Sequence, residues 1–182
     1  KKGVRANGGT PREFCTITVT DGIAMGHEGM KSSLISREVI ADSAELTVRG
    51  HCYDALVGIA GCDKSLPALM MSMVRLNVPS VFIYGGSILP GRYKGKDVTV
   101  VDVFEAVGKH SSGQMSAAEL RKLELVACPS AGACGGQFTA NTMACVSEAI
   151  GLALPYSAGT PAPYEERDKY AKESGKTVMN LL

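Results

Sequence analysis

Three residues of unlike chemistry follow one another at Cys62, Asp63 and Lys64. A thiolate is a soft ligand that suits iron or zinc, whereas a carboxylate is a hard ligand that suits magnesium. The lysine adds an amine beside both. These residues come directly after the apolar run 55–60 and before a helix that Pro67 can open. We therefore expect one strand end to offer ligands to two different metals.

The position of these residues in the expected fold favours ligand binding. The apolar runs 55–61 and 80–84 predict strands, the first of them buried on both faces of a parallel sheet, and residues 66–76 between them predict a helix. This unit predicts an α/β fold in three layers, a small and mainly parallel sheet flanked by helices. In such sheets, ligands gather outside the carboxyl ends of the strands.

A strand and a helix are expected ahead of this unit. Residues 14–20 alternate between apolar residues and threonines, which predicts a half-buried strand. Residues 32–49 carry apolar residues at helical spacing, with Ile35, Val39 and Leu46 on the predicted buried face. Residues 1–13 are polar and rich in glycine, which predicts a surface loop.

Helices are expected to dominate the second half of the chain. Ser116 and Glu119 form a capping box, which predicts that a helix begins there. Thr139 or Asn141 can cap a later helix, which is expected to reach about residue 154. That helix is expected to bury its apolar residues Met143, Val146 and Ile150, and also Cys145. Two more helices are predicted at 102–109 and 164–172.

Composition limits what the protein can be. The 182 residues are 45% hydrophobic and 20% charged, enough for one ordinary core. A formal net charge of +1 gives no basic surface for nucleic acid or an anionic membrane. No apolar stretch has the length of a membrane span, and the first residues lack the apolar region of a signal peptide. We expect a small-molecule partner, no nucleic acid and no membrane.

The cysteines favour thiols over disulfides. The chain has six, at positions 15, 52, 62, 128, 134 and 145, and no secretory signal accompanies them. Only Cys128 and Cys134 are close in sequence, and their spacing matches none of the usual zinc frameworks. Any metal site must therefore be assembled from distant segments. Asp21 could join such a site, although an aspartate before a glycine is more often a turn residue.

Five motifs, in order, resemble the dihydroxyacid and phosphogluconate dehydratase family. The resemblance extends over residues 5–160, and two of the motifs are closer to the branched-chain member of the family. The segments that carry it are 18–26, 36–43, 61–64, 84–91 and 134–143.

The resemblance implies a hydro-lyase that converts 2,3-dihydroxy carboxylic acids into 2-oxo acids, with 2,3-dihydroxy-3-methylbutanoate as the branched-chain substrate. It implies that Cys62 and Cys134 bind an iron–sulfur cluster, either [2Fe-2S] or [4Fe-4S]. It also implies that Asp21, Asp63 and Lys64 bind Mg²⁺. Lys64, which can be carbamylated in the family, is the one catalytic residue expected in this chain.

The resemblance also implies that residues 1–182 are part of an amino-terminal domain. The third cluster cysteine, the catalytic base and a carboxyl-terminal domain are expected outside this chain. The complete protein is expected to be a homodimer in the bacterial cytoplasm, or in an organelle matrix if it is eukaryotic. The 182 residues alone are expected to fold without catalysing the reaction.

Two alternatives remain open from the sequence. One is a sugar-acid dehydratase of the gluconate or 6-phosphogluconate type. The other is a catalytically silent fragment, or a binding module in which Cys62 and Cys134 hold another metal. The iron-to-sulfide ratio separates the last case, because a zinc site contains no inorganic sulfide.

Overall fold

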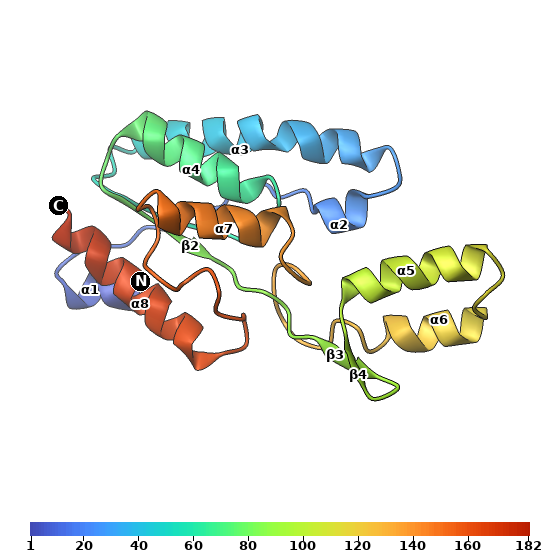
Figure 1. Ribbon diagram of the computed structural model, residues 1–182. Coiled ribbons are helices and arrows are strands. Elements are labelled where there is room, and N and C mark those ends of the chain that lie inside the picture. Colours follow the sequence, from blue (N-terminus) through green and yellow to red (C-terminus); the bar gives the residue numbers. More distant parts are fainter.

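A parallel strand pair lies at the centre of the computed structural model, which describes residues 1–182 (Figure 1). Strands β1 (Leu56–Ala60) and β2 (Ser80–Tyr84) pair with Leu56 opposite Ser80 and Ala60 opposite Tyr84. Helix α4 (Ser65–Leu76) connects them. The α/β unit predicted from the sequence is confirmed, and its strand and helix boundaries are correct to within one residue.

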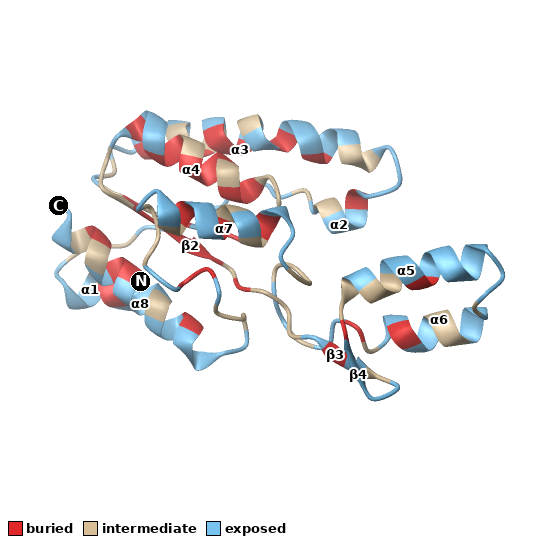
Figure 2. Ribbon diagram, in the orientation of Figure 1, coloured by how far each residue is buried: buried red, intermediate tan, exposed pale blue.

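Helices flank this strand pair. Helix α3 (Gly29–Gly50) packs along α4, and α7 (Thr139–Ala149) contacts both α4 and β2. Helix α8 (Glu165–Asn180), with the short α1 (Lys2–Ala6) against it, lies on the side of the strands away from α3 and α4 (Figure 1). The main core of 17 buried residues lies between these elements (Figure 2). The three-layer α/β fold is confirmed.

The buried face of α3 is not the one predicted. Small residues such as Ala41 and Ala44, both 0% exposed, form the contact with α4. They let the two helices approach so closely that the Ser72 hydroxyl of α4 donates to the Ala41 carbonyl at 3.0 Å. The larger residues Ile35, Val39 and Leu46, on the face predicted to be buried, are 68, 49 and 71% exposed.

The predicted strand at 14–20 is wrong. These residues form no ladder, and Ile17 is 55% exposed, because no other strand lies at hydrogen-bonding register beside them. They lead instead into α2 (Asp21–Ala24). β1 is correspondingly open on one face, where Ile59 is 68% exposed, so its burial on both faces is also wrong. The first residues are helical rather than a loop: α1 packs so tightly that a Cβ on Gly3 would overlap the backbone of α8.

A small lobe stands apart from the main body (Figure 1). It contains the hairpin of β3 (Gly91–Tyr93) and β4 (Lys96–Val98), then α5 (Val100–Ser111) and α6 (Ala117–Glu124). The capping box predicted at the start of α6 is present. Four buried residues form a separate core, namely Val98, Ala106, Leu123 and Ala127.

Helix α7 differs from its prediction at both ends. Thr139 is its first residue and makes no side-chain cap, and the helix ends at Ala149 rather than near residue 154. Val146 is 37% and Ile150 60% exposed, and Cys145 is exposed too, so these three residues are not core. Helix α8 extends beyond its predicted end at residue 172. No helix in the protein combines the length and apolarity that crossing a membrane requires.

Candidate functional site

The turn after β1 holds Cys62, Asp63 and Lys64 at the entrance to α4. The Cys62 amide donates to the Ser65 hydroxyl at 3.1 Å, and that hydroxyl donates to the Cys62 carbonyl at 3.0 Å. These bonds fix the turn, so the two ligand types predicted for this strand end do lie there. All three residues are half-buried.

Asp21 comes to this turn from a distant segment. Lys64 Nζ forms an ion pair with Asp63 and lies 3.6 Å from Asp21 Oδ2. The side chains of Asp21, Asp63 and Lys64 are only 15, 14 and 18% exposed. The Ser33 hydroxyl of α3 donates to Asp21 and holds its carboxylate in this position. The structure therefore brings together all three residues that the resemblance assigns to magnesium, and Asp21 is not a solvent-facing turn residue.

The two carboxylates differ in proton affinity. Burial raises the pKa of Asp21; the hydrogen bond from Ser33 opposes this, and Asp63 adds to it. Burial also acts to raise the pKa of Asp63, but hydrogen bonds from Lys64 and Thr139 outweigh it and lower that pKa below its usual range.

Lys64 is held as an ammonium between the carboxylates. Burial acts to lower its pKa, but Asp63 and Asp21 outweigh this effect and raise it. The ammonium lies between the two carboxylates, where a bound metal cation would also lie. A divalent ion fits this donor set once Lys64 moves aside, or once carbamylation turns the lysine from a competing cation into a further oxygen ligand.

The loop that carries Cys134 packs directly against the end of β1. A Cβ on Gly61 would lie 2.5 Å from the Ala133 Cβ, so the residues before Cys62 and Cys134 are in contact. The Cys134 carbonyl accepts from the Ile88 amide at 2.9 Å, which ties the same loop to the segment that follows β2. Both cysteines are half-buried free thiols.

The surroundings of Cys62 have room for an iron–sulfur group. A hollow of about 440 Å³ opens beside the strand end, and its lining includes Cys62 and the small residues Gly61, Gly85, Gly132 and Ala133. Tyr84, the last residue of β2, has a buried hydroxyl without a hydrogen-bond partner. No three His, Cys, Asp or Glu side chains gather closely enough to hold a metal ion by themselves. That two thiols of this chain share one cluster therefore stays a prediction.

A protein-family model matches the whole chain. The model described as dihydroxy-acid/6-phosphogluconate dehydratase N-terminal matches residues 1–182. The chain belongs to this family.

Dehydratases from several organisms are similar to the chain over its full length. The dihydroxy-acid dehydratase of Pelagibacter ubique is 95% identical over 182 residues, which are 100% of this chain and 32% of that protein. The dihydroxy-acid dehydratase of Parvibaculum lavamentivorans is 82% identical and that of Metallosphaera sedula 56% identical, with 32% and 33% of those proteins covered. The chain thus spans about a third of the length of the relatives it matches.

Two residues of this dehydratase chain support the carboxylates and were not predicted. Ser33 is 0% exposed and orients Asp21, yet nothing in its sequence context separates it from the other serines of α3. Thr139 was predicted as a helix cap, whereas its hydroxyl acts on Asp63. Its place a few residues after the glycine-rich loop was the only signal for this role.

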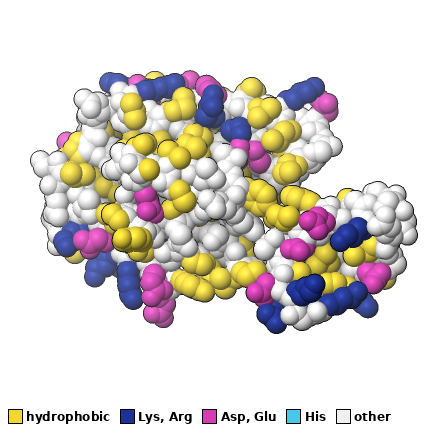
Figure 3. Space-filling model, viewed as in Figure 1, with side chains coloured by type: hydrophobic (Ala, Val, Ile, Leu, Met, Phe, Trp, Pro, Cys, Tyr) yellow, Lys and Arg dark blue, Asp and Glu magenta, His cyan; other side chains and the backbone are white.

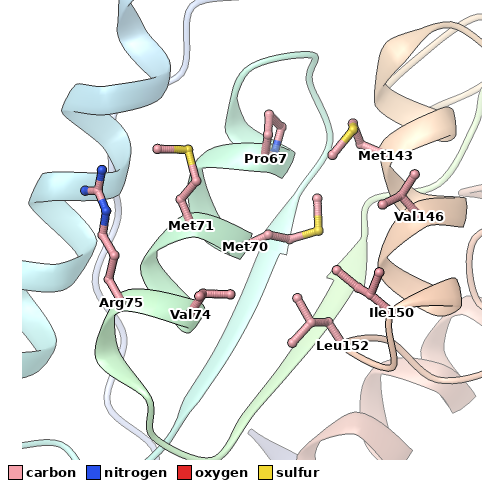
Figure 4. Close-up of a pocket in the computed structure, with 9 residues that line it drawn as sticks. All are labelled: Pro67, Met70, Met71, Val74, Arg75, Met143, Val146, Ile150 and Leu152. Atoms are coloured by element: carbon pink, nitrogen blue, oxygen red, sulfur yellow. The ribbon is translucent and has the colours of Figure 1, made fainter.

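An apolar groove of about 430 Å³ lies between α4 and α7, apart from the candidate site. Figure 4 shows Met70, Met143, Val146, Ile150 and Leu152 pointing toward one another across it. Arg75 is the only charged residue in its lining, and no carboxylate or thiol is present. Figure 3 shows hydrophobic side chains gathered on this face of the molecule.

Proposed function

We propose that the chain is the amino-terminal part of a dihydroxy-acid dehydratase. The reaction removes water from a 2,3-dihydroxy acid to give a 2-oxo acid, as in the conversion of 2,3-dihydroxy-3-methylbutanoate to 3-methyl-2-oxobutanoate. The observation that carries this proposal is identity of 95% over the whole chain to a protein named dihydroxy-acid dehydratase. The convergence of Asp21, Asp63 and Lys64 supports it, since a dihydroxy acid offers oxygen atoms to a hard cation.

The residues of this chain would divide the work between two metal groups. Cys62 and Cys134 would supply thiolates to an iron–sulfur cluster, and Asp21, Asp63 and carbamylated Lys64 would supply oxygens to Mg²⁺. When bound, these groups would supply a Lewis acid for the leaving hydroxyl and a charge that fixes the carboxylate. The small residues at Gly61 and Gly85 would leave space beside Cys62 for the cluster and the substrate. The base that removes the C2 proton is expected outside this chain.

The test is a comparison of substrates with the complete protein that contains this chain, purified without oxygen. We expect 2-oxo acid to form from 2,3-dihydroxy-3-methylbutanoate much faster than from gluconate or 6-phosphogluconate. The reverse preference would identify a sugar-acid dehydratase, which the family description also covers. No turnover of any of these acids by protein loaded with iron, sulfide and magnesium would refute the proposed function.

The assembly and the compartment belong to the same proposal. We expect the complete protein to be a homodimer in the cytoplasm of a bacterium; the three relatives named above are proteins of microorganisms. The exposed apolar residues on α3 and α7 provide surface that further protein could cover. Light scattering coupled to size-exclusion chromatography gives the mass, and a monomer at micromolar concentration would contradict the dimer.

A further inference from the structure

The hydroxyl of Tyr84 is buried and has no hydrogen-bond partner in the chain. Tyr84 is the last residue of β2 and is only 1% exposed, so bulk water does not reach it. Burying a hydroxyl without a partner costs stability, and native proteins rarely contain such a group without a reason. A ligand that accepts this hydrogen bond would be such a reason.

The tyrosine ring is held in one orientation. The guanidinium of Arg167, from α8, lies over the ring with its central carbon 5.7 Å from the ring centroid. Arg167 also donates from Nη1 to the Tyr84 carbonyl at 2.8 Å. Phe82 and Leu66, both 0% exposed, belong to the same core cluster as the ring. The hydroxyl therefore stays where the ring directs it.

Tyr84 lies on the strand that pairs with the one leading to Cys62. Tyr84 pairs with Ala60, two residues before Cys62, and Cys134 packs against the core cluster that contains Tyr84. Burial raises the pKa of Tyr84 far above its usual value, and the charges of Cys134 and, to a smaller extent, Cys62 add to this increase. The group is thus a hydroxyl donor throughout the physiological pH range, and the two cysteines of the proposed cluster site act on it electrostatically.

We propose that Tyr84 is a positioning residue of the thiol site, whose hydroxyl donates a hydrogen bond to a sulfur atom of the iron–sulfur group that Cys62 and Cys134 would hold. This inference rests on the proposed function. Hydrogen bonds to the sulfurs of a cluster raise its reduction potential and help retain it, because they stabilise negative charge on sulfur. They also satisfy the donor, so the unpaired hydroxyl of the metal-free chain becomes a favourable contact in the loaded protein.

The experiment compares Tyr84→Phe with Tyr53→Phe in the complete dehydratase that contains this chain. Tyr53 is a matched control because it packs against the same core but stacks on His51. For Tyr84→Phe we expect a more negative midpoint potential and about tenfold faster loss of iron to a chelator, the lower end of the effect of losing an outer hydrogen bond. The metal-free variant should melt no lower than the wild type, since the removed hydroxyl has no protein partner. Tyr53→Phe should change neither the potential nor the iron loss.

Each other outcome counts against the inference. If the loaded Tyr84→Phe protein keeps the wild-type potential and rate of iron loss, Tyr84 does not contact the cluster, while the cofactor proposal stands. If metal-free Tyr84→Phe melts clearly lower than the wild type, the hydroxyl has a partner within the protein. If the wild-type protein takes up iron without acid-labile sulfide, the cofactor proposal itself fails and this inference fails with it.

Discussion

Lys64 and the carboxylates of Asp21 and Asp63 form the charged cluster at which we propose a metal site. The lysine lies between Asp21 and Asp63, and its ammonium compensates two charges that are largely removed from solvent. Carbamylation would replace that positive charge with a negative one and leave three oxygen ligands facing the same point. The ion pair seen here is therefore the unmodified form of the magnesium site that we propose.

Asp63→Asn in the complete protein tests this role of the carboxylate. The amide keeps the shape but loses the charge that a divalent cation requires, so turnover should fall by about 100-fold or more. The visible absorption of the cluster should persist, because Asp63 is not one of its proposed ligands. Asp97→Asn is the control, since Asp97 is an exposed carboxylate paired with Arg92 in the lobe. Loss of the absorption together with the activity would show that Asp63 is structural.

At the scale of elements, the sequence predicts the type of each helix or strand better than it predicts which elements pair or pack together. The βαβ unit was predictable because its apolar runs are short, bounded and consecutive. The alternation at 14–20 describes two faces of an extended segment but not a strand beside it, and none is present. The hairpin of β3 and β4 went unpredicted although Lys94 and Gly95, both with positive φ, form a tight turn that favours it.

The choice of face on α3 yields a stability prediction. Ala44→Leu should destabilise the isolated chain by about 1–3 kcal/mol, because α3 and α4 leave no space for the added atoms. Ile35→Gln should change the free energy of unfolding by less than about 0.5 kcal/mol, because Ile35 is 68% exposed. Urea unfolding followed by circular dichroism measures both. A larger loss of stability in Ile35→Gln than in Ala44→Leu would mean that the predicted face, and not the observed one, is buried.

Contact between the two cysteine loops can be tested through Gly61. In Gly61→Ala the new Cβ would lie 2.5 Å from the Ala133 Cβ, so the loop before Cys134 must shift, at a cost of about 1–3 kcal/mol. Gly108→Ala is the control: no atom lies within 4 Å of its added Cβ in α5, and it should stabilise by about 0.5–1 kcal/mol. Urea unfolding followed by circular dichroism measures the stability of both variants. If Gly61→Ala is as stable as the wild type, the loops are not in contact.

The whole chain combines two hydrophobic cores with a candidate site at one strand end. Seventeen buried residues form the main core and four form the core of the lobe. The positions of Asp63 and Lys64 at a strand end could be predicted from the sequence, because strand ends in α/β sheets are the usual place for ligands. The approach of Asp21 was expected only from the family resemblance, and the support from Ser33 was not expected, since both depend on how α2 and α3 fold back over that end.

We expect the 182 residues alone to unfold cooperatively but to form no 2-oxo acid. The cores provide the stability, whereas the chain offers two proposed thiolates and no identified base. Thermal unfolding followed by circular dichroism and an anaerobic assay after reconstitution with iron and sulfide test the two halves of this prediction. Sustained turnover by the isolated chain would show that the base and the remaining ligand lie within it, with Cys15 and Ser130 the first residues to examine.

The central claim is that cysteines from distant segments of this chain hold an iron–sulfur cluster, and metal analysis tests it most directly. Iron, zinc and acid-labile sulfide are measured in the complete protein, prepared without oxygen, alongside its Cys134→Ser variant. We predict iron and sulfide in equal amounts in the wild type and the loss of both in the variant. Zinc without sulfide in the wild type, or an undiminished cluster in Cys134→Ser, would contradict the account.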